Sequence, residues 1–299
     1  MREVPHALYP FRGRFFDARG PRMHYLDEGS GEPVVMVHGN PTWSFYYRDL
    51  VKALSPRYRC IVPDHVGMGM SDKPGDDGYE YTLARRVDDL EALLEHLGVR
   101  RDVTLVVHDW GGMIGMAWAA RHPERVARLV VLNTAAFPLP EDKPFPWPLR
   151  LTRTPLGALL VRRLNAFSAV AARVCVTRAP LSPEVRRAYT APYDSYQDRI
   201  ATLRFVQDIP LAPGDRGWRI LEETADRLHL LAHLPALICW GDRDFVFDHA
   251  FLREWRRHLP DAQVVRFPDC GHYVLEDARD EIIPLVQRFL GEHPLPARA

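Results

Sequence analysis

Four short segments of this 299-residue chain carry residue types that could together perform covalent chemistry. The first is VVHDWGG, residues 106–112, in which an apolar run passes through Asp109 into a pair of glycines. This is the layout of a nucleophile elbow, a sharp strand-to-helix turn that exposes one side chain, here an aspartate. The glycines let the helix pack close to the strand, and the turn directs the backbone N–H of Trp110 toward the reaction centre.

An aspartate at this position indicates one kind of reaction. A serine that displaced a leaving group from a saturated carbon would become an ether, which water does not hydrolyse, whereas an aspartate becomes an ester. Water can attack the carbonyl carbon of that ester and regenerate the carboxylate. Asp109 therefore predicts substitution at saturated carbon or the opening of a strained ring. Considered alone, Asp109 has an alternative role as the N-cap of the following helix.

The general base is predicted to be a histidine paired with an acidic residue in the C-terminal part of the chain. PDCGHYVLED places His272 in a turn before the final helix, and CWGDRDFVF ends a strand with Asp242 and Asp244. The nucleophile, the acid and the histidine follow one another in the chain order that this layout requires. We expect Asp244 to accept the Nδ1 proton of His272, because GDRD matches a G-x-x-D placement, and Asp242 to brace the turn. His272 would then deprotonate the water that releases the adduct.

The fourth segment is HGNPTWSFYYRDL, residues 38–50, which follows a buried apolar run. An HG-x-P turn in this place forms the second wall of an oxyanion hole. Here it presents Asn40, whose side-chain amide can donate a hydrogen bond, as can the indole N–H of Trp110. We expect the two groups to hold one developing anion between them. Taken singly, Asn40 could be a turn-former and Trp110 a core residue.

The elements that would position these side chains alternate along the chain. Residues 22–27 are predicted to form a strand, and apolar runs rich in Val, Ile and Leu, typical of buried parallel strands, cover residues 32–39, 59–64, 103–109, 127–133, 235–241 and 262–267. Amphipathic or apolar patterns between them predict helices, notably at 82–98, with Thr82 as N-cap, and at 113–123. This alternation predicts an α/β fold with a mostly parallel, doubly wound sheet, in which ligands bind at the carboxyl ends of the strands.

One interval interrupts the alternation. From about Phe137 to Leu228 the sequence has proline-rich turns and helical patterns but no strand signal. Because ninety residues without structure would be implausible inside a compact domain, we predict an inserted helical cap, or lid, over the strand ends. The expected organisation is core residues 1–136, cap residues 137–228 and core residues 229–299.

Bulk composition is that of an ordinary globular protein. Hydrophobic residues make up 46% and charged residues 26%, and 39 basic residues balance 39 acidic ones, so there is no global field to attract nucleic acid. Arginine is concentrated between Arg150 and Arg187, which predicts a solvated face or a contact with a carboxylate or an acidic partner. Four cysteines without a CxxC pair, no signal peptide and no long apolar span predict a cytoplasmic protein that does not cross a membrane.

Together, HGNPTWSFYYR, PDHVGMGMSDKP, VVHDWGG and CGHYVLED resemble the haloalkane dehalogenases of the α/β-hydrolase superfamily along nearly the whole chain. The donor pair Asn40 and Trp110, with Asp244 as the late acid, is similar to the third dehalogenase subfamily. In the second subfamily the acid is a glutamate just after the strand before the lid, where this chain has Asn133 and Thr134. The resemblance implies an α/β-hydrolase fold and no cofactor or metal.

A narrower resemblance rests on PDHVGMGMSDKP, VVLNTAAFPLP, LNAFS, RRAYTAPYDS and RFVQDIPL. These segments look like the β-lactone decarboxylases of bacterial long-chain olefin biosynthesis. That family implies a small hydrophobic substrate, a cis-β-lactone with two alkyl chains, converted to a cis-alkene and CO₂. It also implies partners, a β-lactone synthetase and a 3-hydroxy-acid reductase. Whether Asp109 attacks the lactone carbonyl or a ring carbon stays open, and haloalkane dehalogenation, with the same donors holding the halide, is the alternative.

Two other functions compete with these. Epoxide hydrolases share the fold and the aspartate, but they typically have Gly two residues before it and an aromatic where Asn40 stands. Val107 and Asn40 therefore argue against an epoxide hydrolase, although Tyr189, Tyr193 and Tyr196 could protonate an epoxide. A non-catalytic binder on the same scaffold would lack part of the Asp109–His272–Asp244 set.

Overall fold

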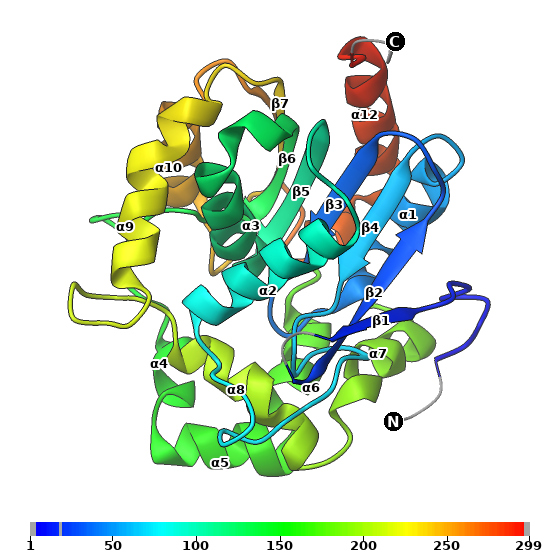
Figure 1. Cartoon of the computed structure of the whole chain (residues 1–299). Coiled ribbons are helices and arrows are strands. Elements are labelled where there is room, and N and C mark those ends of the chain that lie inside the picture. Colours follow the sequence, from blue (N-terminus) through cyan, green and yellow to red (C-terminus); the bar gives the residue numbers. More distant parts are fainter. Residues whose placement is uncertain (1–3, 18–19, 296–299) are drawn as a thin grey trace.

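The computed structural model of the chain describes residues 4–17 and 20–295. It is an α/β fold built on one eight-stranded sheet of order β1-β2-β4-β3-β5-β6-β7-β8 (Figure 1). The strands are β1 Arg14–Asp17, β2 Arg22–Glu28, β3 Pro33–Val37, β4 Arg59–Pro63, β5 Val103–Asp109, β6 Val126–Thr134, β7 Ala236–Gly241 and β8 Gln263–Phe267. All seven expected strands are confirmed, with ends that differ by at most two residues.

The sheet is parallel from β4 to β8 and antiparallel at β1 and β2. Strand β1, RFFD, was not expected, because it has no continuous apolar run and only one of its four residues is even partly buried. It pairs only with β2, in the register Arg14 with Tyr25. An edge strand of this kind is held by backbone pairing rather than by burial, so its composition carries little signal.

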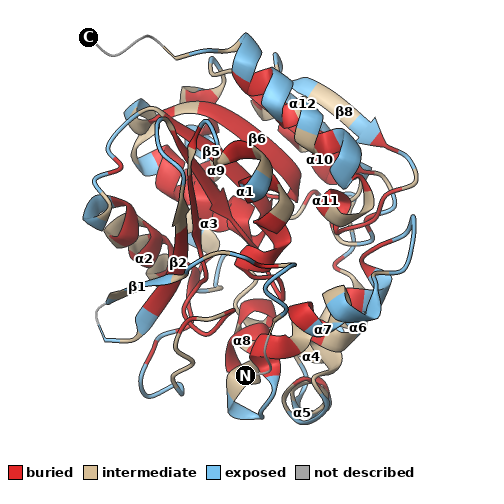
Figure 2. Ribbon diagram, turned by 90° about the vertical axis from the view of Figure 1, so that its right-hand side faces the viewer, coloured by how far each residue is buried: buried red, intermediate tan, exposed pale blue. Residues whose placement is uncertain are grey.

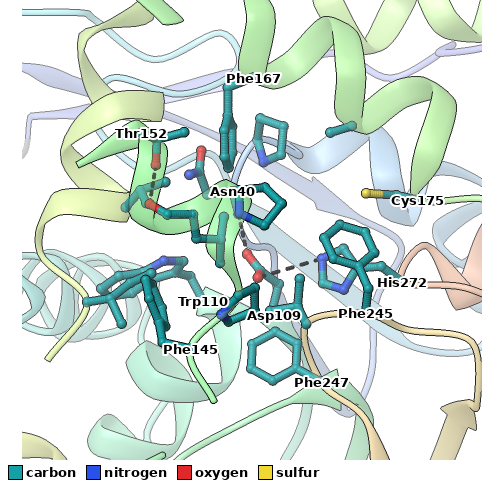
Figure 3. A pocket seen from close by; sticks show the side chains of 18 of the residues that line it. Asn40, Asp109, Trp110, Phe145, Thr152, Phe167, Cys175, Phe245, Phe247 and His272 are labelled. Carbon is teal, nitrogen blue, oxygen red and sulfur yellow. Dashed lines mark hydrogen bonds and ion pairs between the residues drawn. The ribbon is translucent and has the colours of Figure 1, made fainter. Parts of the chain in front are cut away.

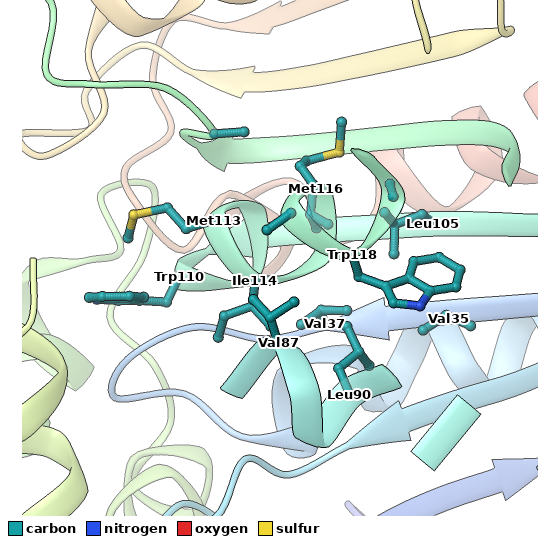
Figure 4. Close-up of a cluster of buried hydrophobic side chains, with 14 of the residues drawn as sticks. Val35, Val37, Val87, Leu90, Leu105, Trp110, Met113, Ile114, Met116 and Trp118 are labelled. Atoms are coloured by element: carbon teal, nitrogen blue, oxygen red, sulfur yellow. The ribbon is translucent and has the colours of Figure 1, made fainter. Parts of the chain in front are cut away.

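Helices cover both faces of the sheet, and each layer has its own buried core. On one face lie α2 Leu83–His96, α3 Trp110–Arg121, α9 Trp218–Arg227 and α10 His249–His258. Figure 4 shows this core, where Ile114 and Trp118 of α3 lie among Val35, Val37 and Leu105 of the strands. On the other face lie α1 Arg48–Leu54, α11 Val274–Asp277 and α12 Arg279–Glu292 (Figure 2). The predicted doubly wound arrangement is confirmed.

At Gly111 and Gly112, in its first turn, helix α3 packs against the sheet too closely to leave space for a side chain. A Cβ on Gly111 would lie 1.9 Å from the Val37 carbonyl oxygen, and one on Gly112 would lie 1.9 Å from Oγ1 of Thr134. Both distances are far inside van der Waals contact, so only glycine fits at these two positions. The glycine pair after the elbow therefore brings the start of α3, and with it Trp110, directly onto the strand ends.

The interval between β6 and β7 contains helices and no strand, as expected. Its helices are α4 Trp147–Thr152, α5 Pro155–Leu164, α6 Ala166–Val174, α7 Pro183–Thr190 and α8 Ile200–Gln207, followed by α9. In Figure 1, α4 to α8 form a layer below the carboxyl ends of the strands, while α9 turns back and packs against α3. We call α4 to α8 the inserted helices.

Two further expectations concern the cysteines and the possibility of a membrane-spanning helix. The four cysteines are buried and form no disulfide, as expected for small apolar side chains. Within the described part of the chain, no helix has both the length and the apolar character needed to cross a membrane.

Candidate active site

Asp109 ends β5 in a strained backbone conformation. Its φ is 52° and its ψ is −126°, a region that side chains other than glycine rarely adopt. The preceding strand and the following helix, which are buried from Val103 to Ala120, hold it there, as in a nucleophile elbow. Asp109 occupies the N-cap position of α3, but its side chain makes no capping hydrogen bond. The elbow therefore points the carboxylate away from the helix and into the space in front of the sheet.

The Asp109 carboxylate is buried and held by main-chain donors. The backbone N–H of Asn40 donates to Oδ1 over 2.5 Å, and a Cβ on the neighbouring Gly39 would lie only 2.0 Å from the same oxygen. Burial raises the pKa of Asp109 above its ordinary value; His272 and the backbone N–H groups of Asn40 and Trp110 oppose this shift. Asp109 is therefore a buried carboxyl group with one oxygen, Oδ1, oriented by the backbone N–H of Asn40.

His272 lies between the two carboxylates expected to flank it. Its Nδ1 is 2.8 Å from Oδ2 of Asp244, and its Nε2 is 3.7 Å from Oδ2 of Asp109 (Figure 3). Burial lowers the pKa of His272, but the charges of Asp244 and Asp109 and the hydrogen bond to Asp244 outweigh it and leave the pKa raised. The distance to Asp109 is that of an ion pair rather than a hydrogen bond.

Asp244 is fixed by the loop that follows β7. Its Oδ1 accepts hydrogen bonds from the backbone N–H groups of Val246, at 2.7 Å, and Phe247, at 3.0 Å, which leaves Oδ2 to face His272. Asp242 points elsewhere and binds the guanidinium of Arg266 through both oxygens. The structure therefore brings Asp244, and not Asp242, to the histidine.

Asn40 and Trp110 both line the same space as Asp109. The Asn40 amide Nδ2 donates one hydrogen bond to the backbone carbonyl of Thr202 on α8, at 3.0 Å, and its buried Oδ1 has no partner. The Trp110 ring packs edge-on against Phe205 of the same helix, with ring centroids 5.1 Å apart. One inserted helix therefore orients both predicted donors, and the second Nδ2 hydrogen remains available to a ligand.

Residue His108, which sequence reasoning passed over, connects the two halves of the site. Its Nε2 is 2.8 Å from the backbone carbonyl oxygen of His272, so this nitrogen carries the proton and donates. The ring stacks on Tyr46, with centroids 4.3 Å apart, and burial holds the pKa of His108 well below its ordinary value. Its position directly before the nucleophile was the available signal, because that side chain must point to the opposite side of β5.

A second histidine network fixes the loop that carries Asn40. His38 Nδ1 lies 2.8 Å from the carbonyl oxygen of Gly39, and His38 Nε2 accepts a hydrogen bond from the backbone N–H of His65 at 3.2 Å. Burial lowers the pKa of His38, which is consistent with this neutral form carrying its proton on Nδ1. His38 therefore fixes the backbone next to Asn40, whose N–H donates to Asp109.

The site opens into an apolar pocket between the strand ends and the inserted helices (Figure 3). Asn40, Asp109, Trp110, Thr152, Cys175 and His272 are the lining residues with polar atoms in their side chains; the others are apolar or glycine. Leu151, Leu160 and Phe167 come from the inserted helices, and Phe245 and Phe247 from the loop after β7. Within residues 4–17 and 20–295, no group of three or more His, Cys, Asp or Glu side chains could hold a metal ion.

The three tyrosines considered as acids for an epoxide lie outside this pocket lining. The Tyr189 hydroxyl donates to Glu276, and the Tyr193 hydroxyl donates to the carbonyl oxygen of Pro41 at 3.0 Å. Tyr196 is half-exposed, under the guanidinium of Arg162. None of these groups is placed to protonate a substrate bound at Asp109.

Comparison with known proteins gives one matching family model and relatives that share one name. Residues 32–278 match the family model described as alpha/beta hydrolase fold. The chain is 59% identical to a cis-3-alkyl-4-alkyloxetan-2-one decarboxylase of Shewanella oneidensis, over 96% of this chain and 90% of that protein. It is 52% identical to the protein of the same name from Xanthomonas campestris pv. campestris, over 96% and 98%.

Haloalkane dehalogenases are similar at lower identity. Haloalkane dehalogenase 2 of Mycobacterium tuberculosis is 34% identical, over 94% of this chain and 96% of that protein. Among solved structures, the haloalkane dehalogenase DatA of Agrobacterium tumefaciens superposes with a TM-score of 0.86 at 26% identity, covering 97% of this chain and all of that one. The chain therefore belongs to the α/β-hydrolase fold family, in the group that contains the cis-3-alkyl-4-alkyloxetan-2-one decarboxylases and the haloalkane dehalogenases.

Proposed function

We propose that this enzyme decarboxylates cis-3-alkyl-4-alkyloxetan-2-ones, which are β-lactones with two alkyl chains, to cis-alkenes and CO₂. The observation that carries the proposal is a buried aspartate at the floor of an apolar pocket, with His272 Nε2 at 3.7 Å. A lactone with two alkyl chains needs an apolar pocket and one carboxylate nucleophile. The 59% and 52% identical relatives bear the name of this activity.

In the first step Asp109 attacks ring carbon C4. The new bond joins an Asp109 oxygen to C4, the bond between C4 and the ring oxygen breaks, and that oxygen leaves as a carboxylate still attached to C3. The carboxylate forms where the Asn40 amide and the Trp110 indole N–H can donate to it, which lowers the barrier. Relief of the four-membered ring drives the step, and the configuration at C4 is inverted.

In the second step the adduct fragments. The bond between C3 and the carboxylate carbon breaks, its electron pair forms the C3–C4 double bond, and the bond from C4 to Asp109 breaks. CO₂ and the alkene leave, and the Asp109 carboxylate returns with its own oxygens, so no water is consumed. Inversion at C4 followed by anti fragmentation converts a cis-lactone into a cis-alkene. Attack at the lactone carbonyl would give an anhydride, whose hydrolysis yields a hydroxy acid instead.

The same residues could release halide from a haloalkane, but that function has weaker support. A haloalkane adduct has no carboxylate to lose, so water deprotonated by His272 would have to hydrolyse it. Relatives named for that reaction are 34% identical, against 59% and 52% for those named decarboxylases. We assign the inserted helices, within a cap of residues 137–228, to closing the pocket around the alkyl chains.

The cellular setting follows from the same family relationship. We propose a cytoplasmic enzyme supplied by a β-lactone synthetase that acts after a 3-hydroxy-acid reductase. Both reactions precede a β-lactone chemically, since the hydroxyl and the carboxyl group must exist before the ring closes. Co-purification of the tagged enzyme with these two activities tests the association, and their absence from the purified material contradicts it.

The deciding experiment is a side-by-side assay of the purified enzyme. A cis-β-lactone with long alkyl chains and 1,2-dibromoethane are offered separately, and alkene, CO₂ and bromide are measured. We expect cis-alkene from the lactone and little bromide. Fast bromide release without alkene would make the protein a haloalkane dehalogenase and overturn the proposal. Asp109→Asn serves as the matched control, because it leaves the pocket and removes the nucleophile.

A further inference from the structure

Exposed apolar side chains are concentrated on the inserted helices. Among the described residues, ten large apolar side chains are exposed, and seven of them lie between Trp147 and Val174. Trp147 is 74% exposed, Leu164 68% and Leu156 59%. Figures 1 and 2 place α5 at the edge of the molecule farthest from the sheet. A contiguous segment of this kind on a protein surface marks a place of contact.

The same segment is strongly basic although the chain as a whole is neutral. Residues 147–187 contain eight arginines, no lysine and one acidic residue, Glu184, so the formal net charge of this segment is +7. The remainder of the chain carries the compensating −7, because basic and acidic residues number 39 each. We call the exposed residues of this segment the 147–187 surface. Arg178 is paired with Asp269 and Glu281 from outside the segment. The field of the other arginines favours an anionic partner.

The pocket opens within the 147–187 surface. Leu151, Val170 and Val174 line the pocket and are also 39%, 52% and 48% exposed. The apolar lining therefore reaches the exterior at α4 and α6, and also at Phe245 of the loop after β7, which lines the pocket and is 43% exposed. A hydrophobic molecule that leaves the pocket by this route meets apolar surface first.

A basic hollow lies beside this opening, on the other side of α6. Arg173 of α6 and Arg186 and Arg187 of α7 line it, and its lining includes no acidic residue. Arginine presents planar donors that match phosphate oxygens. Three arginines that line one hollow offer donors to the phosphate of a lipid headgroup.

We propose that the 147–187 surface docks on an anionic phospholipid bilayer. The exposed apolar side chains of α4 to α6 would lie among the upper acyl chains, and the arginines would contact headgroup phosphates, the hollow at Arg173 holding one of them. A bilayer satisfies both features at once, whereas an acidic protein would leave the apolar side chains without partners. A protein seated over the opening would also close the pocket.

Docking would give the pocket direct access to the lipid phase. A substrate or product with long alkyl chains could pass between pocket and bilayer without crossing water, where exposure of the chains is unfavourable. This consequence rests on the proposed function, but the docking itself does not. Binding to vesicles is therefore measured without any substrate, and its failure would leave the decarboxylase proposal untouched.

The test is flotation of the purified full-length protein with vesicles, either phosphatidylcholine alone or an equimolar mixture with phosphatidylglycerol. We expect binding to the mixed vesicles that weakens as salt is raised, and little binding to phosphatidylcholine. The double variant Leu156→Asp/Leu159→Asp should lose binding at least tenfold. The double variant Arg186→Ala/Arg187→Ala should lose roughly fivefold per arginine, the factor that corresponds to about 1 kcal/mol for one basic residue at an anionic surface.

Matched control variants lie outside the 147–187 surface, on β1 and just before β5. Phe15→Ser removes an apolar side chain that is 50% exposed, and Arg101→Ala removes a guanidinium side chain that is 71% exposed. Both should bind mixed vesicles like the unmodified protein, and all variants should keep its Tm. Absence of binding at low salt, equal loss in the control variants, or variants of the 147–187 surface that change only the oligomeric state would overturn the proposal.

Discussion

Nε2 of His108 donates a hydrogen bond to the backbone carbonyl of His272 over 2.8 Å, and so ties the strand that carries the nucleophile to the loop that carries the histidine. The two residues are 164 positions apart in the sequence. His108 does not itself line the pocket; it acts on the position of His272, which does. It is therefore a positioning residue. By holding the His272 loop against β5, it helps to set the distance of 3.7 Å between His272 Nε2 and Asp109 Oδ2.

Substitution of His108 should affect turnover more than binding. His108→Phe removes the donor and leaves a buried carbonyl without a partner, which costs about 1–3 kcal/mol. We expect kcat to fall at least tenfold with little change in KM, and the pH profile to shift, because displacing His272 weakens the charge that lowers the pKa of the Asp109 nucleophile. His108→Gln, which keeps a donor at similar reach, should recover most of the rate. If His108→Phe and His108→Gln lost the same fraction of kcat and the same number of degrees in Tm, the role of His108 would be purely structural.

Asp109→Asn should abolish turnover and raise the Tm at neutral pH. The substitution removes the anionic nucleophile, and it also removes a charge whose burial raises the pKa of the group in the folded state. A group with a raised folded pKa destabilises the folded protein once the pH exceeds that pKa. Rate measurements and thermal denaturation at neutral pH check both parts. Unchanged turnover would indicate a different nucleophile.

The contribution of His272 to stability should depend on pH. Its folded pKa is raised above the ordinary value of 6.5, mainly by Asp244 against the effect of burial. The stabilisation is therefore fully present below about pH 6.5 and is lost as the pH rises through the raised folded pKa. Asp244→Asn removes the partner charge, so its Tm should fall furthest below that of the unmodified protein at acid pH. A difference in Tm that grows toward alkaline pH would contradict this assignment.

Asn40→Ala should lower kcat by about 10²-fold, the usual effect of removing one donor to a developing anion. The backbone N–H of Asn40 that holds Asp109 is retained in this variant, so the loss reports on the side chain alone. Loss of the bond to the Thr202 carbonyl should lower the Tm only slightly. Steady-state kinetics with the lactone decide the matter, and an unchanged rate would remove the Asn40 side chain from the site.

Isotope labelling should separate fragmentation from hydrolysis. In water enriched in oxygen-18, repeated turnover of the cis-lactone should leave Asp109 unlabelled, because the bond from C4 to Asp109 breaks without water. Turnover of a haloalkane, however slow, should place the label in Asp109, because water attacks the ester carbonyl carbon. Mass spectrometry of the peptide containing Asp109 gives the answer. Label acquired with the lactone, together with a hydroxy-acid product, would contradict the fragmentation step.

The amino-acid sequence by itself determined the sheet and the identity of the residues at its edge. Buried parallel strands must be apolar on both faces, so β3 to β7 stand out as continuous runs, and their carboxyl ends meet at one edge. Asp109 and Asp244 follow such runs directly, and His272 follows β8 after a short turn. Chain order and local turns were therefore enough to predict which side chains would converge, before any distance between them was known.

Only the tertiary structure decided what holds those side chains and where the pocket opens. The partner of the Asn40 amide is the carbonyl of Thr202, and the partner of His108 is the carbonyl of His272; every residue has such a carbonyl, so no residue type announces it. The exposed apolar residues of α4 to α6 look in the sequence like a buried helical stripe, since both follow the same period. Burial depends on what the rest of the chain places beside a helix, and that is set by contacts between residues distant in the sequence.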